Sequence, residues 1–354
     1  KALLNFGSNT ILSNADSRHG REAMKALEFS VAADLFMTPT AELCDYVLPA
    51  ASFLVMSNIT TAFEHRPRGK THLQYRSAVV EAPGERRSDT WMIFALAKRL
   101  GFGAQFWNGD IEAGYAYELE PSGVTLEQLK NTPGGISLPS APTYEKHAKK
   151  SPFHPPLTKG ETGGFSVSTS HGKTDSAARG FATPSKKVEL YCLPFAAHGV
   201  PALPEYVEPA LSPVSRPDIA ADFPVVLTNA KFTTFVHSQQ RALPSLRKSS
   251  PEPGADIHPE TARRFGVKNK EWMIVETPRG AIKVKARVTS DIVPGIICCQ
   301  HGWWQDCKEL ELPGYDPYDW SGANPAMLIG SELADPVSGS LPHRSYLCRV
   351  KPAQ

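Results

Sequence analysis

A carboxylate and a hydroxyl follow an apolar run near the start of this chain, in a pattern suited to holding a polar ligand. In the stretch "SVAADLFMTPTAELC", Asp34 ends the run and Thr38 lies just beyond it. Asp34 suits the diol of a ribose or the N–H edge of a guanine, and Thr38 suits a phosphate or a sugar hydroxyl. A structural role stays open as well, because both side chains can simply cap a short helix over residues 39–44.

The elements around these residues must bring separate loops together. The first part of the chain predicts strands at 2–6, 29–33 and 46–48 and helices at 16–27 and 88–101. This alternation is typical of a parallel sheet covered by helices. Ligands bind beyond the carboxyl ends of such strands, so we expect Gly7, Ser8 and Asn9, which follow the first strand, to share one rim with Asp34.

The later parts of the chain have a different character. Prolines and small polar residues dominate residues 131–222, which predicts a long Pro/Gly-rich surface excursion and connector with one returning strand at 183–195. From residue 223 the sequence predicts several short strands with alternating apolar and polar residues, and one short helix that starts at Pro259. We therefore expect an α/β domain over 1–130, then the excursion, then a compact β-barrel over 223–354.

Composition excludes several classes of function. The 354 residues, which favour two or three domains, are 41% hydrophobic and carry 38 basic and 36 acidic side chains, a net charge of +2. A net charge so close to zero gives no indication of binding to nucleic acid or to anionic lipid. No apolar run approaches the ~20 residues of a membrane span. Neither a GxGxxG motif nor a Walker lysine motif occurs, which disfavours ordinary binding of NAD or ATP.

The cysteines indicate neither a zinc site nor a redox pair. The six cysteines include no C-x-x-C spacing, so a zinc ribbon or a thioredoxin-like site is disfavoured. Cys298 and Cys299 are adjacent on a predicted strand, where neighbouring side chains point to opposite faces. We therefore expect two buried thiols rather than a disulfide.

Several motifs, in order, resemble one enzyme family. "ALLNFGSNT" and "LEFSVAADLFMTPTAELCDYVLPAAS" resemble the third domain of the molybdenum or tungsten bis-pterin oxidoreductases, the dimethyl sulfoxide reductase family. "FPVVLTNAKFTTFVHSQQR", "DIHPETARRFGV" and "SGSLPHRSYLCRV" resemble its fourth domain. The resemblance spans nearly the whole chain outside residues 105–180. It implies that the barrel is six-stranded and double-psi-like.

The resemblance also implies a cofactor and the residues that contact it. The cofactor is bis-molybdopterin guanine dinucleotide, two pyranopterin guanine dinucleotides around one molybdenum or tungsten. The implied contact residues are Gly7, Ser8, Asn9, Asp34, Thr38, Thr228, Asn229, Lys231, His237, Ser238, Asn324, Arg344 and Ser345. The first five lie near the guanosine and the others near the pterin. Lys231 stands where the family usually has arginine, which keeps the charge but loses the bidentate fork.

An aromatic loop offers further candidates. His301, Trp303 and Trp304 follow the predicted strand "GIICCQ". By themselves they are more typical of core aromatics than of a functional group. Because the resemblance places this loop close to the pterin, Gln300 and His301 are additional candidates.

The family's metal ligand and its iron–sulfur cysteines precede the region matched here. The chain starts without Met, directly on an apolar run, so we expect a C-terminal portion with the missing N-terminal half as its partner. That half would hold the iron–sulfur cluster and the metal ligand, so no catalytic residue is assigned within this chain. An iron–sulfur electron-transfer subunit stays open as a further partner. A prokaryotic cytoplasm is favoured, although a targeting signal in the missing part would permit the periplasm.

The activity implied is two-electron redox chemistry, by oxygen-atom or hydride transfer, with electrons passed to an iron–sulfur cluster. "GWWQDCKEL" and "SLPHRSYLCRV" look most like the branch of acetylene hydratase and anaerobic acyl-CoA or hydrocarbon-oxidising enzymes. Two alternatives stay open. One is a non-redox hydratase in which tungsten acts as a Lewis acid toward water. The other is a structural relative that has lost the pterins.

Overall fold

The chain forms two compact units. The computed structural model describes residues 1–61, 72–138, 158–159, 165–166, 183, 185 and 187–353. One unit combines Lys1–Pro49 with Glu205–Gln354, and the other is Ala50–Pro204. Within the predicted excursion, residues 139–157, 160–164, 167–182, 184 and 186 lie outside the described residues, and the predicted boundaries at 130 and 222 stay predictions.

The first unit begins with the expected parallel sheet. Its strands are β1 (Ala2–Phe6), β2 (Phe29–Asp34) and β3 (Tyr46–Pro49), in the order β1-β2-β3. Helices α1 (Thr10–Ser13) and α2 (Ser17–Lys25) connect β1 to β2, and the short helix expected over 39–44 is a 3-10 helix at Ala41–Leu43. Parallel strands end at the same edge of their sheet, so the loops after β1 and β2 share one rim, as predicted.

The second half of this unit is the predicted barrel. Six strands close it in the order β10-β12-β11-β14-β9-β13. They are β9 (Val225–Ala230), β10 (Gly254–Ile257), β11 (Trp272–Thr277), β12 (Gly280–Val288), β13 (Ile296–Gln300) and β14 (Tyr346–Pro352). Alternate side chains such as Met273, Val275, Ile282 and Val284 are fully buried and fill the interior. Three short helices, α7 (Pro217–Asp222), α8 (Pro244–Arg247) and α9 (Pro259–Arg264), each have proline in their first turn.

Two barrel strands run parallel and end side by side. Ala230 at the end of β9 pairs with Gln300 at the end of β13. The loops that follow must therefore emerge at the same rim of the barrel. They approach so closely that a Cβ at Gly302 (φ +82°) would lie 2.7 Å from the His237 carbonyl oxygen. Glycine is needed there for its positive φ and for the close approach of the backbones.

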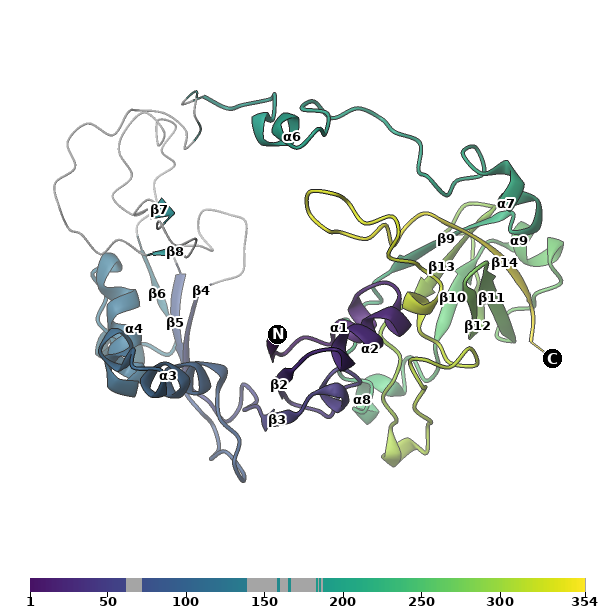
Figure 1. The fold of residues 1–354 in the computed structure, drawn as a ribbon. Coiled ribbons are helices and arrows are strands. Elements are labelled where there is room, and N and C mark those ends of the chain that lie inside the picture. The colour runs from purple at the N-terminus through teal and green to yellow at the C-terminus, as the bar shows by residue number, and fades with distance from the viewer. Residues whose placement is uncertain are drawn as a thin grey trace. The chain divides into compact units, whose positions relative to one another are not determined.

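The start of α2 fastens the parallel sheet to the barrel. The backbone N–H of Asp16 donates to the carbonyls of Ala326 and Ile329, at 2.8 and 2.9 Å. The Asp16 carboxylate pairs with Arg279 at 2.7 Å, and Arg279 also reaches Glu332 at 3.2 Å. Figure 1 shows α1 and α2, in purple, beside the green strands of the barrel. Residues far apart in the chain can therefore build one site.

The second unit contains two small antiparallel sheets and several helices. Its elements are β4 (Asn58–Thr61), β5 (His72–Arg76), α3 (Asp89–Arg99), α4 (Ile111–Leu119), α5 (Leu126–Lys130), β6 (Ile136–Ser137), β7 (Thr158–Lys159), β8 (Phe165–Ser166) and α6 (Leu193–Ala197). Helix α3 confirms the prediction over 88–101, with the Ser88 hydroxyl accepting from the Trp91 N–H at 3.1 Å. No described helix is long and apolar enough to cross a membrane.

The strand predicted at 183–195 is wrong. The described residues of that stretch form no strand, and its end belongs to α6. Pro194 lies in the first turn of α6, where its fixed φ suits a helix and its missing N–H is not needed. The alternating pattern "KKVELYC" therefore did not outweigh the proline that follows it.

Candidate functional site

A groove at the rim of the barrel gathers most of the polar residues predicted in the second half. Its volume is about 540 Å³. It is lined by Leu12 and Ser13 of α1, the loops after β9 and β13, residues 325–326 and residues 341–345. The predicted residues among its lining are Asn229, Lys231, His237, Ser238, Arg344 and Ser345. The structure thus brings together two predicted segments that lie about a hundred residues apart in the sequence.

The groove carries two free cations. Lys231 and Arg344 are both exposed and line the groove. Within the described part of the chain, neither has a hydrogen-bond or ion-pair partner. Asn229 bridges the two segments, since its Nδ2 donates to the His343 carbonyl at 3.0 Å. The groove therefore presents positive charge, hydroxyls and imidazoles on a rim fixed by backbone contacts, which suits a polar anionic ligand.

A buried arginine holds the two rim loops together. The Arg241 guanidinium is 3% exposed and donates to the carbonyls of His237 and His301, at 2.6 and 2.7 Å. It also lies over the rings of Phe235 and Trp303. Burial, and then the charge of the neighbouring Arg247, lower the pKa of Arg241 to about 9. The side chain therefore stays charged at neutral pH and fixes the backbones that carry both histidines.

Two histidines meet inside the groove. His237 Nδ1 lies 3.4 Å from His301 Nε2, and the ring centroids are 5.6 Å apart. Burial lowers the pKa of His301 to about 4, and the neighbouring His237, Arg241 and Lys231 add to the effect. His301 is therefore neutral at pH 7 and can donate or accept a single hydrogen bond at each nitrogen. His301, which the sequence analysis named as an additional candidate, therefore lies among the groove residues.

The residues predicted around a guanosine lie at the rim of the parallel sheet, outside the lining of the groove. Asp34 Oδ1 accepts from the backbone N–H groups of Leu35 and Phe36, at 2.7 and 3.3 Å. Its Oδ2 has no partner among the described residues. The Thr38 hydroxyl accepts from the N–H of Ala41, the first residue of the short 3-10 helix, at 3.2 Å, whereas the N-cap position of that helix is Thr40. Gly7 (φ +60°) donates through its N–H to Ala33, and Ser8 is half-buried.

Three predicted contact residues lie inside the protein or along a strand. Asn9 is 9% exposed, and its amide bonds Ser238 and Thr40. Asn324 is fully buried, and its amide bonds three groups of the protein. Thr228 is half-buried on β9 opposite Cys298. These three residues are placed next to the groove or its neighbouring loops without lining it.

Sequence reasoning missed the side chains that support the groove. Arg241 and Arg247 are both buried, and Arg247 donates to four backbone carbonyls. Thr40 is fully buried between two loops. No local signal marks these residues, because charged and hydroxyl side chains in loops are usually solvated.

The thiols predicted to be buried are buried. All six cysteines are free, and Cys298 and Cys299 have 9% and 0% exposure. Burial raises the pKa of Cys298 to about 11, with a further contribution from Asp256. Among the described residues, no cluster of His, Cys, Asp and Glu could hold a metal ion. Cys298 and Cys299, on strand β13, are therefore part of the packed wall of the barrel.

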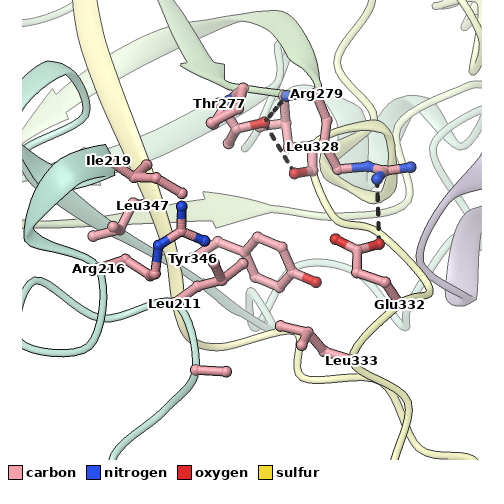
Figure 2. Close-up of a pocket in the computed structure, with 12 residues that line it drawn as sticks. Leu211, Arg216, Ile219, Thr277, Arg279, Leu328, Glu332, Leu333, Tyr346 and Leu347 are labelled. Carbon is pink, nitrogen blue, oxygen red and sulfur yellow. Dashed lines mark hydrogen bonds and ion pairs between the residues drawn. The ribbon is translucent and has the colours of Figure 1, made fainter.

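A second cavity in the same unit has a different chemistry. It has a volume of about 360 Å³ and lies between the connector before β9 and the barrel. Figure 2 shows its largely apolar wall, with the pair formed by Arg279 and Glu332 to one side. Its polar side chains already have partners within the protein: Arg216 with Asp218, Thr277 with Leu328, and Tyr346 with Gly330. These three side chains therefore differ from Lys231 and Arg344 of the groove, which have no partner among the described residues.

Comparison with known families matches both halves of the first unit, and the first match extends into the second unit. Residues 1–99 match the family described as molybdopterin oxidoreductase. Residues 225–346 match the molydopterin dinucleotide binding domain. The second match contains the groove residues from Asn229 to Ser345.

Several relatives match nearly the whole chain. The acetylene hydratase of Syntrophotalea acetylenica is 30% identical over 350 residues, which cover 96% of this chain and 42% of that protein. The assimilatory nitrate reductase catalytic subunit of Bacillus subtilis is 28% identical, over 90% of this chain and 40% of that protein. The solved structure of the acetylene hydratase from Pelobacter acetylenicus aligns with a TM-score of 0.78 at 26% identity. That alignment covers all of this chain and 44% of the other, so the chain spans less than half of these relatives.

Proposed function

Because the chain belongs to the molybdopterin oxidoreductase family, we propose that it binds the dinucleotide form of molybdopterin in a molybdenum or tungsten enzyme. The complete enzyme would hold two guanine dinucleotides. When bound, the metal and its pterins supply two-electron redox chemistry, by oxygen-atom or hydride transfer. The residues of this chain bind and orient the cofactor.

The groove is the observation that carries this proposal. Lys231 and Arg344, which have no partner among the residues that the structure describes, match the negative charge of a phosphorylated cofactor. The imidazole of His237 and the hydroxyls of Ser238 and Ser345 offer donors and acceptors for the ring edge of a pterin. The donor set therefore fits the cofactor that the family implies.

The rim of the parallel sheet fits the guanosine end. Asp34 keeps one carboxylate oxygen for its own loop, and the other has no partner among the described residues and can accept from the N–H groups of a guanine edge. The Thr38 hydroxyl accepts the Ala41 N–H, and its own O–H has no acceptor among the described residues. This contact with the 3-10 helix and ligand binding are therefore compatible at Thr38.

The remaining parts of the site belong to other segments. The chain spans 42% of its acetylene hydratase relative. We place the protein ligand to the metal and an iron–sulfur cluster in an N-terminal half, with an electron-transfer subunit as a further partner. In that arrangement the present chain determines cofactor retention and the electrostatics around the pterin.

Metal and nucleotide analysis of the complete enzyme tests the proposal. We expect about one molybdenum or tungsten and about two GMP per chain after acid release, since each dinucleotide carries one GMP. The metal is measured by mass spectrometry and GMP by chromatography. A protein without metal and without GMP would instead support the pterin-free structural alternative.

A non-redox hydratase is the second candidate. It is favoured by the match to acetylene hydratase in both sequence and structure, over nearly the whole chain. In that case the metal would act as a Lewis acid toward water with no net electron transfer. Electron paramagnetic resonance during turnover separates the two: a redox enzyme changes its signals with substrate, whereas a hydratase keeps them.

A further inference from the structure

We propose that Thr40 is a positioning residue that keeps the rim of the parallel sheet and the groove of the barrel in one fixed arrangement. Thr40 lies in the loop after β2, is fully buried and does not line the groove. The inference rests on the cofactor binding proposed above. It concerns how the protein aligns the two ends of that cofactor.

The Thr40 hydroxyl joins two loops and reaches toward a third. It donates to Asn9 Oδ1 at 3.0 Å and accepts from the backbone N–H of Ile11 at 3.1 Å. Asn9 in turn donates through Nδ2 to the Ser238 hydroxyl, at 3.3 Å. Ser238 lines the groove in the loop after β9. One buried hydroxyl therefore connects the loops after β1 and β2 with a groove residue.

The same network continues into the barrel beyond α1. The Ser17 hydroxyl donates to the Ile11 carbonyl at 2.6 Å and accepts from Asn324 Nδ2 at 2.8 Å. Asn324 donates its other N–H to the Pro317 carbonyl, and its Oδ1 accepts from the Ala326 N–H. Ala326 also lines the groove. The network therefore reaches the groove from two sides.

Burial makes this network rigid. Asn9, Ser17, Thr40 and Asn324 are 9%, 1%, 0% and 0% exposed. A buried donor or acceptor without a partner is costly, so each member restricts the orientation of the next. Without the Thr40 hydroxyl, the Ile11 N–H and Asn9 Oδ1 lose their partner. Asn9 can then turn away from Ser238, and the two loops of the sheet are no longer held against the groove.

A ligand that spans both regions needs them aligned at the same time. A dinucleotide with its guanosine at the sheet rim and its pterin in the groove binds as two linked parts, so misalignment weakens the second contact once the first is made. The effect should therefore appear as faster loss of the cofactor, beyond any loss of stability.

Three variants of the complete enzyme test the role of Thr40. Thr40→Val removes the hydroxyl at nearly constant side-chain volume, whereas Thr40→Ser keeps the hydroxyl and removes only the methyl group. Thr261→Val is the matched control, because Thr261 is 4% exposed and its hydroxyl accepts the Gly295 N–H at 2.9 Å. We expect Thr40→Val to lose guanine nucleotide on dialysis about tenfold faster than the wild type. Thr40→Ser and Thr261→Val should retain it at the wild-type rate, even where Thr261→Val melts earlier.

The possible results distinguish a failure of this inference from a failure of the proposed cofactor binding. Equal nucleotide retention in Thr40→Val and Thr261→Val would show a structural role alone and overturn the inference. A wild-type enzyme without guanine nucleotide would overturn the proposed function and this inference with it. If Thr40→Val does not fold, Ser17→Ala interrupts the same network between Ile11 and Asn324. Ser17→Ala must then lose nucleotide faster than Thr261→Val.

Discussion

His237 and His301 approach each other within the groove, with Nδ1 of His237 3.4 Å from Nε2 of His301. Only one proton can lie between these two nitrogens. His301 is the more buried of the two rings, and its Nδ1 has no partner among the described residues. The pair is therefore a place where protonation and ligand binding are coupled, because a proton on His301 Nδ1 has no acceptor among the described residues.

The first prediction concerns the proton affinity of His301. Burial and the adjacent positive groups lower its pKa to about 4, whereas an unfolded histidine titrates near ~6.5. Between these two pH values the unfolded state binds more protons, so stability falls as the pH drops through the window and levels off below it. A 13C NMR titration of labelled imidazoles, with His301→Gln to assign the resonance, measures this pKa. Titration of His301 near ~6.5 would contradict the prediction.

The second prediction concerns Arg241. Arg241→Met keeps much of the volume but leaves the carbonyls of His237 and His301 without their donor. Because Arg241 is buried and both bonds are at least partly buried, we expect the free energy of unfolding to fall by about 2–4 kcal/mol. Chemical denaturation followed by Trp fluorescence measures the change, since Trp303 lies against the guanidinium.

An exposed arginine provides the control for this measurement. Arg287 pairs with Asp256, but its side chain is 56% exposed. Arg287→Met should cost less than ~1 kcal/mol, because exposed ion pairs contribute little. Equal losses in the two variants would mean that Arg241 does not hold the rim loops.

The third prediction separates the two roles of Asp34. Asp34→Asn keeps an oxygen for the N–H groups of Leu35 and Phe36 but replaces the free oxygen with a donor. A loop role alone predicts a stability change of up to ~1 kcal/mol and full cofactor content. A guanosine role predicts loss of GMP from the complete enzyme, because a charged acceptor contributes roughly 1.5–3 kcal/mol. Earlier melting with all GMP retained would identify Asp34 as structural.

Local patterns predicted the elements that form this site. Short apolar runs punctuated by Gly, Asn and Pro located β1, β2 and β3, and the alternation of "EWMIVETPRGAIKVKARV" located β11 and β12. These signals are local, because strand periodicity and turn chemistry act over a few residues. The prediction of a strand at 183–195 was wrong, because Pro194 within that stretch favours the start of a helix.

Long-range partners could not be predicted in the same way. Asn9 and Asn324 bond Ser238 and Ser17, which lie 229 and 307 residues away. Nothing in a local window tells whether an amide points to a ligand or to a distant hydroxyl. Arg241 is a similar case, because an arginine in a polar loop is usually solvated and only the folded rim provides its carbonyl acceptors.

The final prediction concerns the two cations of the groove. Lys231 and Arg344 come from segments that meet only in the folded barrel, and neither has a partner in the described part of the chain. Cations that line one groove without a partner repel each other, so their presence there is best explained by a bound anion. Removing either one should cost the bound phosphate or pterin a charge-assisted hydrogen bond, about 1.5–3 kcal/mol.

We therefore expect Lys231→Met and Arg344→Met to lose guanine nucleotide about 10- to 150-fold faster than the wild type. Lys231→Arg should retain it, because the charge remains and the guanidinium adds a planar fork. Lys268→Met is the control, since Lys268 is 78% exposed, pairs with Glu271 and does not line the groove. Release of the intact dinucleotide at rising salt concentration is followed by acid treatment of the released fraction and chromatography of its GMP. Salt should accelerate the wild-type release, because screening weakens the contacts of the exposed cations, and it should act less on the two Met variants. If all four variants release GMP at one rate, the anion lies elsewhere on the protein.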